Sequence, residues 1–204
     1  MYKHIIFDFG GVFLNLGEKY TTMPNALSRI FNVTQDRASE YWRENKEKLL
    51  IGKETPRKFL EEMSKELGVH IDLEKAYESW RSYHSAEKEQ IDWKLLEYVR
   101  HLKKNYKIHM LTDAIDLDRE SSRWTSEVDR HFNNVFKSYE EKLKKPDRKA
   151  FLNALKKIKA RPEECLFVDD LKANVDAANE LGIKGILFTN SKALKADFKK
   201  LGIA

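Results

Sequence analysis

The chain lacks three features that define whole classes of protein. Its 204 residues include one cysteine, Cys165, so an intramolecular disulfide framework is excluded. Four prolines and eight glycines are too few for a collagen-like or low-complexity chain. Apolar runs such as Ile5–Phe7 are far shorter than the roughly 18 residues that a membrane-spanning helix needs. We therefore expect a folded protein with no membrane segment, and the single cysteine is typical of the cytoplasm.

Charge of both signs is abundant. Lysine and arginine number 38 and aspartate and glutamate 33, which gives a net charge of +5. The excess is spread over lysine pairs on predicted helices, such as Lys103–Lys104 and Lys199–Lys200, as solvated faces are. Binding to nucleic acid would need a clustered basic face with aromatic residues for stacking, so we expect no nucleic-acid partner. An anionic small molecule is compatible with the charge.

Short apolar runs alternate with longer amphipathic stretches along most of the chain. The runs predict buried strands at 4–7, 107–111, 135–136, 165–168 and 185–189. The stretches between them predict helices at 92–104, 116–132, 146–158, 171–181 and 191–201. This alternation predicts an α/β fold with a Rossmann-like parallel sheet.

Residues 16–90 interrupt the alternation, because they contain no convincing strand. Their spacing predicts four helices, at 22–31, 35–50, 55–67 and 72–84. Thr55-Pro56 is a typical helix start, and Gly68 is a typical helix end. We therefore predict an α/β core formed by residues 1–15 and 91–204, with an inserted all-helical cap domain over 16–90.

Carboxylates follow the predicted strands at the points where these end. Asp8 follows the first strand, Asp113 comes directly after Thr112, and Asp169-Asp170 follows a later strand. Parallel strands bring such residues to one edge of the sheet, where ligands bind. At an effective dielectric of about 20, two like charges about 4 Å apart repel by about 4 kcal/mol, so a cation or shifted pKa values are needed. Oxygen ligands without His or Cys favour Mg²⁺, although single strand-end carboxylates also serve as helix N-caps.

Three further residues have two open interpretations each. Lys145, before Pro146, could point at a phosphate and at Asp8, or it could lie in solvent within a basic run. The Thr112 hydroxyl could donate to a phosphate oxygen or cap the next helix. Gly10, with its neighbour Gly11, permits a sharp turn and a close approach to a ligand.

In this order, the segments resemble the four motifs of the haloacid dehalogenase (HAD) superfamily, and the resemblance spans nearly the whole chain. The first motif is similar to 8–12, the second to Thr112, the third to 145–147 and the fourth to 169–174. Residues 16–90 resemble the cap that family members insert. The resemblance implies a HAD-type phosphatase of the sugar-1-phosphate phosphatase kind, which also has glycine at the position of Gly10.

The resemblance also implies roles for these residues. Asp8 is implied as the nucleophile of phosphoryl transfer. Mg²⁺ is implied to bind Asp8, the backbone carbonyl of Gly10 and Asp170, with Asp169 direct or through water.

The phosphate-binding residues implied by the resemblance are Thr112, Asp113 and Lys145, and Lys145 would also offset charge on Asp8. The expected function is Mg²⁺-dependent hydrolysis of a small phosphorylated metabolite. The expected assembly is a monomer or a homodimer.

Gly10 departs from the usual phosphatase pattern, in which a second Asp protonates the leaving group and then activates water. Such general acid–base help is typically worth about 10²- to 10⁴-fold. A HAD-like binding or regulatory protein with little turnover therefore stays open. A 2-haloacid dehalogenase, which attacks carbon without a metal, also stays open, but it has no need for the adjacent carboxylates Asp169-Asp170.

Overall fold

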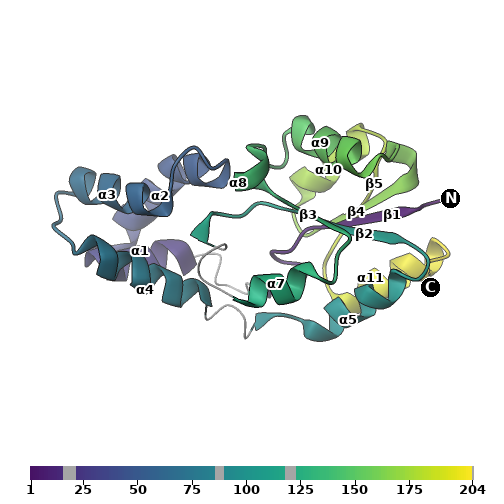
Figure 1. Cartoon of the computed structure of the whole chain (residues 1–204), viewed down its shortest axis with the longest axis horizontal. Helices are drawn as coiled ribbons and strands as arrows, with labels where there is room; N and C mark the ends of the chain where they lie inside the picture. Colours follow the sequence, from purple (N-terminus) through teal and green to yellow (C-terminus); the bar gives the residue numbers. More distant parts are fainter. Residues whose placement is uncertain (16–21, 86–89, 118–122, 204) are drawn as a thin grey trace.

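The computed structural model describes residues 1–15, 22–85, 90–117 and 123–203 and contains one parallel sheet (Figure 1). Its five strands lie in the order β3-β2-β1-β4-β5. They are β1 (His4–Phe7), β2 (Lys107–Thr112), β3 (Asn134–Lys137), β4 (Cys165–Asp169) and β5 (Lys184–Leu187). The chain proceeds outward from β1 to β3 and then returns to place β4 on the other side of β1. The change of direction between β1 and β4 marks the place where ligands bind in sheets of this kind.

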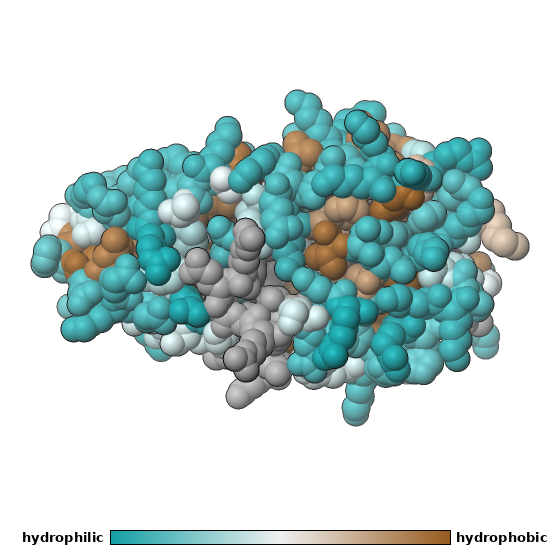
Figure 2. Space-filling view, in the orientation of Figure 1, coloured by the Kyte–Doolittle hydropathy of each residue, from teal (hydrophilic) through white to brown (hydrophobic). Residues whose placement is uncertain are grey.

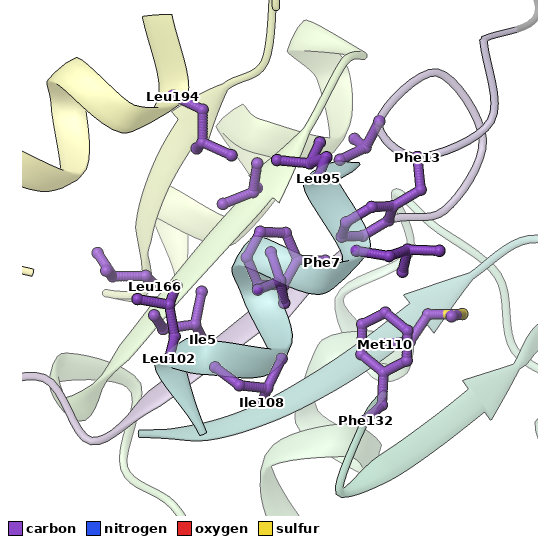
Figure 3. Packing of buried hydrophobic residues seen from close by; sticks show 14 of the residues in the cluster. Ile5, Phe7, Phe13, Leu95, Leu102, Ile108, Met110, Phe132, Leu166 and Leu194 are labelled. Carbon is purple, nitrogen blue, oxygen red and sulfur yellow. The ribbon is translucent and has the colours of Figure 1, made fainter. Parts of the chain in front are cut away.

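The central strands are buried on both faces, which explains why they are short, continuous apolar runs. In β1, Ile5 and Phe7 belong to one hydrophobic cluster, while Ile6 belongs to another on the opposite face. Figure 3 shows the first cluster, in which Phe7 lies close to Phe13 from the turn after β1. In β4, Phe167 belongs to the second cluster with Ile6. Each face therefore needs a covering layer of helices.

Helices cover both faces of the sheet and make a three-layer core (Figure 1). One face carries α5 (Trp93–Leu102), α7 (Arg123–Asp129) and α11 (Ser191–Lys200). The other carries α9 (Arg148–Ile158) and α10 (Lys172–Glu180). The short α8 (Ser138–Glu141) directly follows β3, and a 3₁₀ turn at Pro162–Glu164 precedes β4.

Four helices between β1 and β2 form a separate lobe, on the left in Figure 1. They are α1 (Thr22–Phe31), α2 (Gln35–Leu50), α3 (Pro56–Leu67) and α4 (Leu73–Ser85). Thr34 and Thr55 cap α2 and α3 by accepting hydrogen bonds from backbone amides, and Gly68 ends α3 with φ +65°. The helices enclose their own hydrophobic cluster, which includes Phe59 and Trp80.

The predicted fold class, an α/β parallel sheet with an inserted helical region, is confirmed. Most predicted helices and strands agree with the observed ones to within a few residues at each end. Of the helix predicted over 116–132, residues 118–122 lie outside the described part, and α7 occupies a later portion. The domain boundaries at 15/16 and 90/91, the cytoplasmic location and the choice between monomer and homodimer stay predictions.

The surface is largely hydrophilic (Figure 2), as the high content of charged residues predicts. Among the helices in the described ranges, none is both long and apolar enough to cross a membrane. Figure 2 shows a face covered largely by hydrophilic residues, with apolar residues in small separate groups.

Two histidines that alternate with apolar residues in β1 and β2 pair with each other. His4 Nδ1 lies 3.1 Å from His109 Nε2, and the two rings are stacked. His109 is 2% exposed. Burial lowers the pKa of His109 to about 4, and burial also lowers the pKa of His4. The pair is therefore a neutral, structural contact between neighbouring strands.

This pair predicts a loss of stability in acid. Between pH 6.5 and 4 the unfolded chain binds a proton at His109 that the folded chain does not, so the free energy of unfolding decreases as the pH is lowered through this range. We expect a loss of about 2 kcal/mol between pH 7.5 and pH 5 from this group. His109→Gln, which cannot ionise, should remove that loss in denaturant unfolding measured at both pH values. An equal effect of His70→Gln, at an exposed position, would contradict the assignment.

Candidate active site

Three carboxylates meet at the C-terminal edge of the sheet, where β1 and β4 lie side by side. Phe7 pairs with Val168 in the parallel ladder, so Asp8 follows β1 beside Asp169 at the end of β4. Carboxylate oxygens from Asp8, Asp169 and Asp170 all lie within 4.8 Å of one another. The structure thus brings together residues that are more than 160 positions apart.

Lys145 lies between two of these carboxylates. Its Nζ is 2.7 Å from Oδ1 of Asp8 and 2.7 Å from Oδ2 of Asp169, and its side chain is 1% exposed. A buried ammonium needs such partners, because an unpaired charge away from water is strongly destabilising. Of the two interpretations left open by the sequence, the structure therefore supports the one in which Lys145 faces Asp8.

The electrostatics of the cluster are unbalanced toward negative charge. Burial raises the pKa of Asp8, with Asp169 adding to the effect and Lys145 opposing it. Burial also raises the pKa of Asp170 and of Asp113. Burial lowers the pKa of Lys145, but the surrounding carboxylates outweigh this and raise it above its ordinary value. The ammonium of Lys145 contacts two of these four carboxylates, so a further cation would stabilise the ionised forms of the group.

Asp169 is oriented by hydrogen bonds from three directions. Its Oδ1 accepts a hydrogen bond of 2.8 Å from the backbone N–H of Leu171, and its Oδ2 accepts one of 2.7 Å from Lys145 Nζ. Asn174 Nδ2 lies 3.1 Å from Oδ1 and 3.0 Å from Oδ2. Sequence patterns alone assign Asn174 no separate role; the signal that points to it is a polar residue five positions after Asp169 on the buried side of α10. Asn174 and the Leu171 amide thus fix the carboxylate that holds Lys145.

Asp170 is placed differently. Its Oδ1 is buried and has no hydrogen-bond partner among the described residues. Its carboxylate packs directly against Gly11, where a Cβ would lie 2.1 Å from Oδ2. Gly11 has φ +71°, which also favours glycine. The turn after β1 therefore needs glycine at this position so that Asp170 can enter the cluster.

The segment after β2 is tied to the segment that carries Lys145. Thr112 ends β2 and is buried. Asp113 Oδ1 accepts a hydrogen bond from the Lys145 backbone N–H at 3.1 Å. Ser138 Oγ accepts from the Ala114 N–H and donates to the Ala114 carbonyl. The Asp113 carboxylate thus positions Lys145, a role that the sequence did not suggest, and its expected part in phosphate binding stays a prediction.

The cluster fits a hard divalent cation. Its donors are carboxylate oxygens, and within the described residues no His or Cys belongs to it, which favours Mg²⁺ over zinc. The buried Asp170 Oδ1 is an acceptor that a cation would satisfy. The space that Gly11 leaves for the Asp170 carboxylate keeps this acceptor beside Asp8.

The chain belongs to the haloacid dehalogenase-like hydrolase family, whose model matches residues 2–182. D-ribitol-5-phosphate phosphatase from Bacteroides thetaiotaomicron is 23% identical over 192 residues, which is 90% of each chain. A predicted HAD-like family hydrolase from Porphyromonas gingivalis superposes with a TM-score of 0.80 at 23% identity, covering 100% of this chain and 99% of that one. The structure of a HAD family enzyme from Bacteroides thetaiotaomicron, in complex with magnesium and inorganic phosphate, superposes with a TM-score of 0.75 at 21% identity, covering 95% of this chain and 99% of that one. The predicted family and the predicted enzyme class, a phosphatase-type hydrolase, are confirmed.

The Gly11–Asp170 contact predicts a defect in metal binding. In Gly11→Ala the new methyl group displaces the Asp170 carboxylate, because the two cannot occupy the same space. We expect Mg²⁺ affinity, measured by titration calorimetry, to fall by about 10- to 100-fold. Gly202→Ala is the matched control, since Gly202 has φ +73° but no atom within 4 Å of the position that a Cβ would take. Equal Mg²⁺ affinity in the two variants would contradict this role of Gly11.

Proposed function

We propose that the protein is a Mg²⁺-dependent phosphomonoester hydrolase that acts on a small phosphorylated metabolite through an aspartyl-phosphate on Asp8. The observation that carries this proposal is the buried Lys145 between Asp8 and Asp169, with Asp170 beside them. A site that binds an organic acid and attacks carbon has no use for the excess of carboxylates, so the arrangement favours phosphoryl transfer over dehalogenation. The phosphatase relative supports the same choice.

Asp8, Thr112 and Lys145 have separate roles in the proposed reaction. One Asp8 oxygen is held by Lys145, which leaves the other to attack phosphorus in line as the bond to the leaving oxygen breaks. The Thr112 hydroxyl and the Lys145 ammonium contact the transferring phosphoryl oxygens. Water then attacks the phosphorus of the aspartyl-phosphate, which releases inorganic phosphate and restores the Asp8 carboxylate. Such a reaction depends mainly on positioning and on positive charge near the phosphoryl oxygens.

Mg²⁺ would be held by Asp8, the backbone carbonyl of Gly10 and Asp170. Asp169, whose two oxygens already accept hydrogen bonds, would support the ion directly or through water. The ion supplies positive charge that offsets the carboxylates and the phosphoryl group.

Phosphate release tests the proposal directly. We expect release from a panel of sugar phosphates, nucleotides and p-nitrophenyl phosphate to require Mg²⁺ and to stop with chelator. Asp8→Asn removes the nucleophile, so kcat should fall at least about 10³-fold. Asp176→Asn changes an exposed aspartate that pairs with Lys172 and should retain activity.

Release that persists in Asp8→Asn would contradict the nucleophile assignment. Mg²⁺ binding without release from any compound would favour the second candidate function, a binding or regulatory protein. The observation behind that candidate is Gly10, which offers no side chain for acid–base chemistry.

Gly10 predicts a preference for good leaving groups, such as aryl, acyl or anomeric phosphates. Because no carboxyl at this position protonates the departing oxygen, kcat/KM should fall as the pKa of the leaving alcohol rises. Gly10→Asp should raise turnover on alkyl phosphates at least about tenfold, while the isosteric Gly10→Asn, which cannot donate an acidic proton, should not. A flat dependence on leaving-group pKa, or equal effects of the two variants, would contradict the idea.

A further inference from the structure

The helical lobe contacts the core at a place that the proposed chemistry does not use. Lys142 Nζ, at the end of α8, donates a hydrogen bond of 2.8 Å to the carbonyl of Gly52, in the loop between α2 and α3. We propose that Lys142 is a positioning residue that holds this loop over the catalytic edge of the sheet. Its effect on substrate binding rests on the proposed function, whereas its effect on the placement of the lobe does not.

Gly52 permits an approach that no other residue would allow. Its φ is +58°, and a Cβ there would lie 2.3 Å from the Tyr139 carbonyl oxygen and 2.5 Å from Lys142 Nζ. The backbone of the loop therefore lies directly against the backbone of α8. Since α8 begins immediately after β3, this contact lies at the same edge of the sheet as Thr112 and Asp8.

The loop is a firm attachment point because it is bonded to the end of its own helix. The backbone N–H groups of Lys53 and Glu54 both donate to the Lys48 carbonyl, and the N–H of Gly52 donates to Leu49. The Lys142 ammonium thus lies at the C-terminal end of α2, where the partial negative charge of the helix favours a cation. A displacement of Gly52 therefore also displaces the C-terminal end of α2, to which the loop is hydrogen-bonded.

On the core side, the contact lies in the segment that carries the catalytic lysine. Lys142 has φ +60°, which is uncommon for a residue other than glycine, and it lies three residues before Lys145. The segment after β2 also packs against the lobe, because Ile115 and Leu117 belong to the hydrophobic cluster of α1–α4. Ser138 connects the two segments through its hydrogen bonds to Ala114. The placement of the lobe and of Lys145 therefore depends on the same two segments.

The Lys142–Gly52 hydrogen bond is exposed to solvent. Exposed charged contacts are weakened by water and salt, so this bond can break and re-form during substrate entry and product release. By contrast, the contacts of Lys145 with Asp8 and Asp169 are buried, where water and salt weaken them less. This difference suits Lys142 to a contact that adjusts the lobe rather than to chemistry.

Lys142→Met keeps the unbranched shape and most of the length of the side chain but removes the donor. For p-nitrophenyl phosphate we expect KM to rise about three- to tenfold, with kcat changed less than about twofold, because the lobe loses a positioning contact while the catalytic residues stay in place. Lys142→Arg, which retains a donor, should restore most of the affinity. Lys149→Met, at an exposed position on α9, is the matched control. Gly52→Ala should act like Lys142→Met, and Gly68→Ala should not, since Gly68 has a similar φ but no atom within 4 Å of its Cβ position.

A distance measurement tests the inference without any enzyme activity. Spin labels on Lys65→Cys in α3 and Lys156→Cys in α9, both exposed positions, report the separation of lobe and core by pulsed electron paramagnetic resonance. The native Cys165 does not interfere, because it is buried and escapes labelling. Lys142→Met and Gly52→Ala should broaden or lengthen the distance distribution, while Lys149→Met and Gly68→Ala should leave it unchanged.

Unchanged distances in Lys142→Met and Gly52→Ala would overturn the inference, and so would changed distances with an unchanged KM. If the wild-type protein releases no phosphate, the proposed function fails, and the distances alone then decide: a shift supports the positioning role and no shift overturns it.

Discussion

The buried ion pair of Lys145 with Asp8 and Asp169 constrains the rest of the molecule. Each of these charges alone would be costly to bury, by several kcal/mol, so the Lys145 ammonium requires both carboxylates within hydrogen-bond distance and each carboxylate requires the ammonium. That requirement fixes the ends of β1 and β4 and the segment after α8 relative to one another. Asn174, the Leu171 amide and the Asp113 carboxylate then hold the parts of this arrangement in place. The result is a fixed positive charge at the point where strand order reverses.

The negative charge that Lys145 does not balance is the basis of the function. Asp170 reaches the cluster only because Gly11 leaves room for it, and its buried Oδ1 has no donor within the described part of the chain. A protein that needed only stability would gain nothing from that oxygen, since an unpaired buried acceptor is destabilising. A cation would satisfy this oxygen, and phosphoryl transfer in general depends on positive charge near the transferring group.

The sheet and the helical lobe meet through segments that both belong to the site. Lys142 and Ser138 follow β3, and Ile115 follows β2, so the residues that contact the lobe are neighbours of Lys145 and Asp113 in the chain. The contacts that place the lobe and the contacts that place Lys145 therefore share the segments after β2 and β3. The weak, exposed contact of Lys142 and the strong, buried contact of Lys145 perform different tasks in one short segment.

The sequence by itself determined the strands, the helices and the edge at which Asp8, Asp169 and Asp170 meet. Strands buried on both faces must be continuous apolar runs, and parallel strands place their final residues at one edge, so local patterns carry this information. Only the tertiary structure decided that Lys145 is buried rather than solvated, that Asp113 positions Lys145, and that Asn174 orients Asp169. The tertiary structure also explains why positions 11 and 52 require glycine, because a Cβ at either would collide with atoms of a distant segment. These facts depend on distances of a few ångströms between segments that are distant in the chain, and no local periodicity encodes such distances.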